Sequence, residues 1–450
     1  MDQDHAASQQ ANTGTLRGLP PRFWALTLLT GIAAGVAAIA MMAILHAVQH
    51  VAFGYHSGEY STAVAHHSDL RRLLVLLIGG LVAGAGLWTM RRFLGGTGGQ
   101  PTAVVWSGRG RLSLPLTALS GALSEIVIAL GASIGRENAP QHLGAAFGDW
   151  ASRRRALSAD QRLLLIACGA GAGVGAVYNV PFAGAVFAAE LYLGSITLRA
   201  IVPAFVTAGI ATAVSWIVLP IRPVYHLPQL GYPSGSLLVF SLLAGPLIGL
   251  AAAAWVKLVA WANRRRPHGR ALLVQPPLAF CALGLIAFQY PLLLGNGRDL
   301  AQFAFTGGGA LLTLLALGLL KPVVTALCLR SGAQGGLLTP TMSTGAVLGA
   351  FLGHAWALLW PGTPAASYAI VGSAAMLAAG MRTPVAALAF TIELTNSVNP
   401  VILAMLVALA GAMLTARLIE RRSIYSARLP ATLVPQDATP QTKPTAGGRT

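Results

Sequence analysis

The chain has 450 residues, of which 55% are hydrophobic and only 10% carry a charge, and its mean hydropathy is +0.66. This composition excludes a soluble domain and indicates a membrane protein with many spans. The net charge of +17 suggests nucleic acid as a partner, but the basic residues lie in short clusters between apolar segments, where membrane topology explains them. We therefore expect no binding of nucleic acid.

The first apolar run, residues 23–48, is too long for the core of a signal peptide and predicts an uncleaved first span. Several later apolar segments are shorter than the ~20 residues that a full crossing needs, which predicts tilted and partial helices. The expected parts of the chain are a polar cytoplasmic N-terminal tail (1–21), a first membrane repeat (22–220), a linker (221–234), a second membrane repeat with a final helix (235–429) and a disordered C-terminal tail (430–450).

The sequence offers no metal or cofactor site. Cys168, Cys281 and Cys328 lie in apolar runs without the spacing of metal ligands, so they are predicted to be buried packing residues. The polar loop that contains His56 and His67 lacks helical ligand spacing and carboxylate partners. We expect neither a metal nor a cofactor.

Arg136 and Glu137 stand side by side deep inside apolar sequence, and burying such a pair in lipid is costly. Gly131 and Gly135 can supply unusual backbone dihedrals, and Pro140 suits the first turn of a new helix. The pattern predicts a helix that is broken inside the membrane, with a second half that begins near Glu137. The N-terminus of that half is a ready anion site, because its free N–H groups and its dipole both favour negative charge. The alternative is a surface loop between two spans.

The chain also contains an internal repeat. Residues 181–191 recur as 384–394, with Pro, Ala, Phe, Glu and Leu coinciding at a displacement of 203 residues (384 − 181). The glycines of residues 131–148 recur in 332–349 at a displacement of 201 residues (332 − 131). Two matches at nearly one displacement indicate a duplicated unit.

Loop charges indicate that the two repeats have opposite orientations. Loop 52–70 holds no Lys or Arg, whereas its counterpart in the second repeat is rich in them, and segment 153–162 is rich in Arg, whereas its counterpart 354–367 has none. Lys and Arg mark the cytoplasmic side of short loops, so equivalent loops face opposite sides. The sequence therefore predicts an all-α polytopic membrane protein of two inverted-topology repeats, with its binding site near the midplane. Arg71 and Arg72, next to the uncharged loop, are the exception.

Four short motifs stand out along the chain. They are Gly96-Thr97-Gly98-Gly99-Gln100, Gly135-Arg136-Glu137-Asn138-Ala139, Gly335-Gly336-Leu337-Leu338-Thr339-Pro340 and Ile424-Tyr425-Ser426-Ala427. They resemble motifs of the CLC family of chloride channels and chloride/proton antiporters, and the likeness covers nearly the whole membrane region. The family's counterparts are, in the same order, Gly-Ser-Gly-Ile-Pro, which is the weaker match, Gly-Arg-Glu-Gly-Pro, Gly-Gly-Ile-Phe-x-Pro and the segment with the chloride-site tyrosine. The chain is most similar to the short bacterial members that lack cytoplasmic nucleotide-sensing CBS domains.

The resemblance implies a chloride pathway with Glu137 as its gate. It assigns hydroxyl donors to Thr97 and Tyr425 and backbone N–H donors to Leu337 and Leu338, which together would surround a dehydrated anion. Such partial charges attract chloride without trapping it, so no full positive charge is needed. The resemblance further implies a homodimer in the bacterial inner membrane, with one pathway per subunit and both termini in the cytoplasm.

Three departures from the family pattern bear on proton coupling. Asn138 and Ala139 replace the family's Gly-Pro after the glutamate, and Thr97 replaces a serine. Leu191 stands where proton-coupled members carry an inner glutamate, and leucine cannot carry a proton. The sequence therefore leaves open a passive voltage- or pH-gated channel and a chloride/proton exchanger.

Two other functions are considered for this chain, followed by the roles of four charged residues in its apolar segments. Broken helices also serve secondary transporters of other inorganic or small organic anions, which is the alternative function. An intramembrane hydrolase is disfavoured because no nucleophile–base or metal-ligand pairing occurs at credible spacing, so we expect no enzyme. Glu190 and Glu393 are equivalent in the repeat, which predicts structural roles at helix ends, whereas Glu125 and Lys321 are either interior partners or pathway residues.

Overall fold

The computed structural model of the chain is all-helical and describes residues 16, 18–228, 230, 234–396 and 401–433. Within these residues, eight helices are long and apolar enough to cross a membrane. Most of the N-terminal tail expected at 1–21, and residues 434–450 of the expected C-terminal tail, lie outside the described residues. The fold described below is therefore that of the two membrane repeats and the linker between them.

The first half contains α2 (Pro21–Phe53), α3 (Tyr60–Ala65), α4 (Asp69–Phe93), α5 (Pro101–Ser107), α6 (Leu114–Ala129), α7 (Asn138–Arg154), α8 (Ala159–Tyr178), α9 (Pro181–Phe187), the π-helix η1 (Ala188–Tyr192) and α10 (Leu198–Ser215). The second half contains α11 (Gly235–Arg264), η2 (Gly269–Leu273), α12 (Gln275–Gln289), η3 (Pro291–Leu293), α13 (Arg298–Phe305), α14 (Leu311–Arg330), α15 (Leu338–Ala357), α16 (Ala365–Met381), α17 (Pro384–Thr395), α18 (Ile402–Ile419), η4 (Ser426–Arg428) and η5 (Ala431–Leu433).

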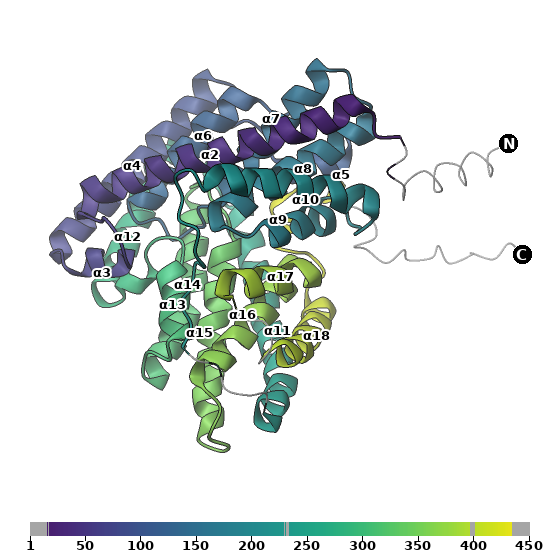
Figure 1. The fold of residues 1–450 in the computed structure, drawn as a ribbon. Coiled ribbons are helices and arrows are strands. Elements are labelled where there is room, and N and C mark those ends of the chain that lie inside the picture. The colour runs from purple at the N-terminus through teal and green to yellow at the C-terminus, as the bar shows by residue number, and fades with distance from the viewer. Residues whose placement is uncertain (1–15, 17, 229, 231–233, 397–400, 434–450) are drawn as a thin grey trace, which may run out of the picture.

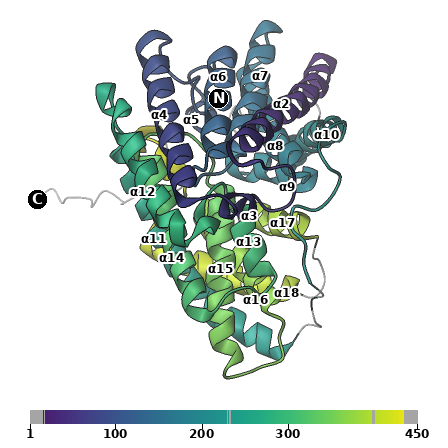
Figure 2. The same cartoon turned by 90° about the vertical axis from the view of Figure 1, so that its left-hand side faces the viewer.

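The two halves pack against each other as separate layers. Figures 1 and 2 show the helices of the first half, purple to teal, on one side and those of the second half, from teal α11 to yellow α18, on the other, with α9 and α17 in contact at the junction. Each half repeats the same local packing, in which α7 lies against α8 and α15 lies against α16.

The repeated glycines explain this packing. A Cβ atom on Gly144 would collide with the backbone carbonyl of Gly169, and one on the equivalent Gly345 would collide with that of Gly372. The helices of each pair thus approach until their backbones touch, which small residues alone permit. The repeated glycines of the sequence therefore allow the same close helix packing in both halves.

The equivalent helices α7 and α15 run in opposite directions, which confirms the inverted topology. The C-terminal end of α7 lies where α8 begins, with Nε of Arg162 2.6 Å from Oδ1 of Asp149, and α8 then runs to Tyr178 on the face that the linker covers. In contrast, α15 ends on the linker face, where Nε1 of Trp356 donates to Oγ of Ser236 at 3.0 Å. From the break near the centre, α7 thus runs away from the linker face and α15 runs toward it.

Arg71 and Arg72 fit this topology because they bind helix ends. Arg71 donates from Nε and Nη2 to the carbonyl of Ala52, near the end of α2, at 3.2 and 2.9 Å. Arg72 donates from Nε to the carbonyl of Val64 at 3.1 Å, near the end of α3, and pairs with Asp69 at 3.2 Å. Basic side chains at helix C-termini satisfy free carbonyls and the helix dipole. Their position therefore reports on local capping rather than on the side of the membrane.

Glu190 and Glu393 cap each other's repeat. The Glu190 carboxylate accepts hydrogen bonds from the N–H groups of Val385 and Ala386 at 3.2 and 2.7 Å, in the first turn of α17. The Glu393 carboxylate accepts the equivalent pair from the first turn of α9, at 3.2 and 2.6 Å. Carboxylates stabilise helix N-termini by both charge and hydrogen bonding. The predicted structural role at helix ends is confirmed for both residues.

Candidate functional site

The two broken helices meet through equivalent glycines. Gly135 and Gly336 form an antiparallel bridge, with N–H to carbonyl bonds of 2.8 and 2.7 Å in the two directions. The breaks themselves occur at Gly131 and Gly332, whose φ angles of 113° and 100° favour glycine. Gly135 does not have the unusual dihedral that we expected, because its φ is not positive. Glycine leaves room there for the carboxylate of Glu137, which a Cβ would displace from its position.

Glu137 is buried, with 1% of its surface exposed, and it directly precedes α7 without a capping hydrogen bond from its side chain to that helix. Its Oε1 accepts a hydrogen bond from the N–H of Leu338 at 2.9 Å, at the first residue of α15. Its Oε2 accepts from the hydroxyls of Tyr178 at 2.9 Å and Thr339 at 3.2 Å. The carboxylate of the first broken helix therefore occupies the N-terminus of the second, where the free N–H groups and the helix dipole favour an anion.

A small polar cavity of about 20 Å³ is lined in part by Gly336. This volume suits a single water molecule or another particle of that size. Burial raises the pKa of the Tyr425 phenol well above its usual value, so its hydroxyl stays protonated and able to donate. We call this space the inner cavity, and its lining is Gln100, Thr102, Asn138, Gln141, His142, Tyr192, Gly336, Tyr425 and Arg428.

The structure brings only part of the predicted residue set to this region. Leu338 contacts Glu137 directly, Leu337 immediately precedes α15, and Tyr425 lines the inner cavity. Thr97 is partly buried and its carbonyl accepts from Oγ of Ser120 at 3.0 Å, but Thr97 does not line the inner cavity. Thr102, from the same segment of chain, lines it.

Sequence reasoning missed three polar residues that contact the site. Tyr178 and Thr339 each place a hydroxyl within hydrogen-bonding distance of Oε2 of Glu137, and their own oxygens lie 2.6 Å apart, so their two protons serve two of these three contacts at a time. Arg428 lines the inner cavity and donates to the carbonyl of Gly335 at 3.4 Å, and its buried Nε atom has no hydrogen-bond partner among the residues that the structure describes. The one signal in the sequence was closeness to a motif along the chain: Thr339 lies inside the motif 335–340, and Arg428 directly follows the motif 424–427.

Lys321 is an interior partner of the first broken helix. Its ammonium group is buried and donates to Oγ of Ser133 at 2.8 Å and to the carbonyls of Gly295 and Leu293 at 3.1 and 3.3 Å. It therefore fastens the loop that leads to Glu137. Glu125 is also fully buried, and within the described residues neither of its carboxyl oxygens has a hydrogen-bond partner.

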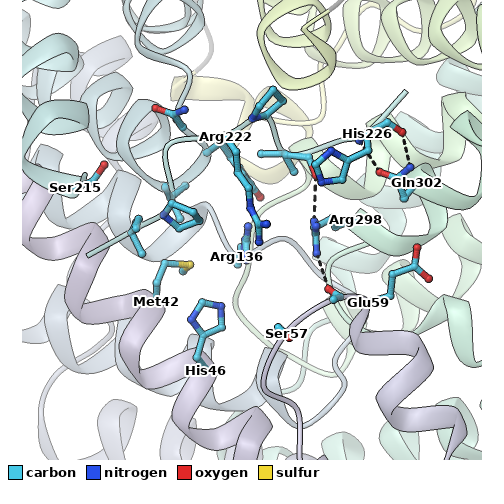
Figure 3. A pocket seen from close by; sticks show the side chains of 18 of the residues that line it. Met42, His46, Ser57, Glu59, Arg136, Ser215, Arg222, His226, Arg298 and Gln302 are labelled. Atoms are coloured by element: carbon cyan, nitrogen blue, oxygen red, sulfur yellow. Dashed lines mark hydrogen bonds between the residues drawn. The ribbon is translucent and has the colours of Figure 1, made fainter. Parts of the chain in front are cut away.

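A larger cavity, of about 530 Å³, opens beside Tyr178 between α2, α13 and the linker (Figure 3). We call it the vestibule. Tyr178, whose hydroxyl contacts Glu137, and Arg136 both belong to its lining. Its titratable lining is strongly basic and consists of Arg136, Arg222, Arg298, His46, His56 and His226, with Glu59 as the carboxylate and Tyr55 and Tyr178 as phenols.

Comparison with known proteins identifies the family of this chain. Residues 79–417 match the family described as voltage gated chloride channel. The chain belongs to this family, the CLC proteins. It is 33% identical over 418 residues to a ClcB-like protein of Ralstonia nicotianae, described as a chloride channel protein, across 90% of this chain and 96% of that one. It is 30% identical over 439 residues to the H(+)/Cl(-) exchange transporter ClcA of Cronobacter sakazakii, across 92% and 90% of the two chains.

Solved CLC structures share the fold. A slow cyanobacterial Cl−/H+ antiporter superposes with a TM-score of 0.78 at 24% identity, across 93% of this chain and 100% of that one. A CLC-type fluoride/proton antiporter superposes with a TM-score of 0.72 at 21% identity, across 90% and 97%. The protein is therefore a multi-pass membrane protein of the CLC fold that transports anions, and the alternative of an unrelated anion transporter is not favoured.

Proposed function

We propose that this CLC protein transports chloride across the bacterial inner membrane and that Glu137 is its gate. The observation that carries the proposal is the contact between the Glu137 carboxylate and the N–H of Leu338 at the start of α15. A carboxylate at that position competes with an anion for the same donors. Chloride passes when the side chain leaves, and protonation of the carboxyl favours leaving because it removes the negative charge.

The proposed chloride ligands are the N–H groups of Leu337 and Leu338 and the hydroxyl of Tyr425. The N–H of Leu338 contacts Glu137 and Tyr425 lines the inner cavity, so an anion moving from the Glu137 position to the inner cavity would exchange one donor for the other. Thr97 stays a predicted ligand by resemblance alone.

The proposed orientation puts the vestibule outside the cell. The faces that carry residues 153–155 and 264–266 are rich in Arg, whereas the linker face contributes few basic residues beyond those of the vestibule. The positive-inside rule then places both termini in the cytoplasm. By family resemblance we also propose a homodimer with one pathway in each subunit, and a polypeptide without enzymatic activity.

Proton coupling separates two versions of this function. Leu191 is buried, and its carbonyl accepts a hydrogen bond from Nε1 of Trp106 at 3.2 Å. Because its side chain is a hydrocarbon, it offers no proton carrier at the family's inner glutamate position. A passive channel would move chloride alone, whereas an exchanger would need water or another group to bring protons to Glu137. The curated relatives include both kinds by name, as a ClcB voltage-gated channel of Salmonella typhi and ClcA exchangers show.

The test is to measure chloride and proton fluxes together from chloride-loaded liposomes that contain the purified protein. A potassium ionophore clamps the voltage, and wild type is expected to release chloride faster at lower pH. Glu137→Gln and Glu137→Ala remove the charge and are expected to abolish this pH dependence. Uphill proton movement driven by chloride identifies exchange, and its absence identifies a channel. No chloride release at any pH would refute the function, and pH-dependent release from both variants would refute the gate.

A further inference from the structure

The vestibule carries more positive charge than the nearby carboxylates neutralise, although Nη1 of Arg298 lies 3.8 Å from Oδ1 of Asp299. Within the described residues, neither Arg136 nor Arg222 forms an ion pair, and the Nε atom of Arg136 is buried without a hydrogen-bond partner. Glu59 is the single carboxylate in the lining. Guanidinium groups that share a cavity repel one another unless an anion lies between them. An anion from solution would therefore relieve the repulsion between the guanidinium groups in the vestibule.

The walls of the vestibule are held in place by hydrogen bonds. Arg298 donates to the carbonyls of Gly58 at 3.2 Å and Val224 at 3.4 Å, which ties α13 to the linker and to the loop after α2. Gln302 accepts from the N–H of His226 at 2.9 Å and donates to its carbonyl at 2.7 Å. Figure 3 shows Arg136, Arg222 and Arg298 directed into the space between these walls. A preformed cavity with several convergent cations is a binding site by its construction.

The chemistry of the site favours an oxyanion over chloride. A guanidinium group presents a planar fork of N–H donors that matches two oxygens of one anion, and several such groups favour a double negative charge. Full charges also hold an anion more firmly than rapid passage allows. A polyatomic anion fits in about 530 Å³ but cannot follow chloride into the inner cavity of about 20 Å³. Its place is therefore in the vestibule and not in the pathway.

We propose that the vestibule binds a small doubly charged oxyanion between Arg136, Arg222 and Arg298, and that the bound oxyanion slows chloride transport. The guanidinium carbon of Arg136 lies 5.3 Å from the centre of the Tyr178 ring, and the Tyr178 hydroxyl holds Glu137. An oxyanion on Arg136 thus stands at the entrance to the gate and excludes chloride from it. The effect on transport, but not the binding itself, rests on the proposed chloride function.

Inorganic sulfate is the probe for the test. Chloride release from liposomes is measured with increasing external sodium sulfate, and with sodium gluconate at equal ionic strength to separate binding from screening. Sulfate is expected to inhibit in a saturable way the molecules whose vestibule faces the added salt. Calorimetric titration of detergent-solubilised protein with sulfate measures binding without any transport.

Arg222→Gln is the diagnostic variant, because Arg222 is exposed and its replacement does not disturb the core. Its half-inhibiting sulfate concentration, relative to its own sulfate-free flux, is expected to rise about three- to tenfold. Arg270→Gln, an exposed arginine outside the vestibule, is the matched control and is expected to keep the wild-type value. Equal inhibition of wild type and Arg222→Gln, equal inhibition by gluconate, or no heat of sulfate binding overturns the proposal. Absent chloride flux without sulfate counts against the transport function instead.

Discussion

The hydroxyl of Tyr178, at the end of α8, donates a hydrogen bond of 2.9 Å to the carboxylate of Glu137, at the start of α7. The same hydroxyl lies 2.6 Å from Oγ1 of Thr339 on α15, so it joins both repeats at the proposed gate. Tyr178 also lines the vestibule. The residue thus connects the vestibule to the carboxylate that we propose as the gate.

Tyr178→Phe keeps the ring and removes only this donor. A hydrogen bond to a charged group contributes about 1.5–3 kcal/mol, so its loss is expected to reduce occupancy of the blocking position about ten- to a hundredfold. Chloride should then compete better, and the half-saturating chloride concentration for release should fall. Tyr290→Phe, at the end of α12 and away from Glu137, is the control. Wild-type kinetics in Tyr178→Phe would show that the hydroxyl does not hold the gate.

Arg428→Gln tests whether the inner cavity uses a full positive charge. Because Arg428 lines this cavity and has an unpaired buried Nε atom, its removal is expected to weaken chloride binding about tenfold by calorimetry. Arg428→Lys keeps the charge and should bind chloride more tightly than Arg428→Gln does. Arg421→Gln changes an exposed arginine of the same segment and should bind chloride like wild type. Unchanged chloride binding in Arg428→Gln would show that the inner cavity binds chloride through partial charges alone.

Glu190→Gln and Glu393→Gln should destabilise the protein equally. Each variant weakens two hydrogen bonds to the first turn of the opposite short helix, α17 or α9, and removes the charge that favours that helix end. A loss of about 1–3 kcal/mol is expected for each, seen as a lower Tm in detergent. The exposed Glu59→Gln should change stability by less than about 0.5 kcal/mol. A large difference between the two cap variants would contradict their equivalence.

Gly144→Ala and Gly209→Ala should act in opposite directions although both lie in helices. A Cβ on Gly144 would collide with the carbonyl of Gly169, and such overpacking costs about 1–3 kcal/mol. A Cβ on Gly209 of α10 would meet no atom within 4 Å, and alanine favours a helix by about 1 kcal/mol over glycine. Thermal unfolding in detergent should therefore show a lower Tm for the first variant and a higher Tm for the second.

The repeated pattern made much of this fold predictable. The glycines of α7 and α15, the twin glutamates and the loop charges all report constraints that are local or periodic, so they can be read along one chain. The short helix α13 was missed because Arg298, Asp299 and Gln302 make it polar, and its vestibule and linker contacts follow only from the fold.

The candidate site was predictable only where a motif fixed the backbone. Glu137 and Leu338 come from broken-helix motifs, so their meeting follows from two repeats that face each other. Tyr178 and Arg428 act through side chains whose directions depend on how helices from distant segments cross. No spacing in the sequence encodes such a crossing, and the polar lining of the inner cavity needed the structure.

The bridge between Gly135 and Gly336 limits how this protein can open. It consists of two main-chain hydrogen bonds at the centre of the molecule, and it fastens the equivalent loops of the two repeats to each other. A rocking of one repeat against the other would break both bonds in a buried region, where unsatisfied backbone groups are costly. Rotation of one carboxylate side chain needs neither bond to break. The fold therefore favours a stationary frame in which the side chain of Glu137, the proposed gate, is the moving part.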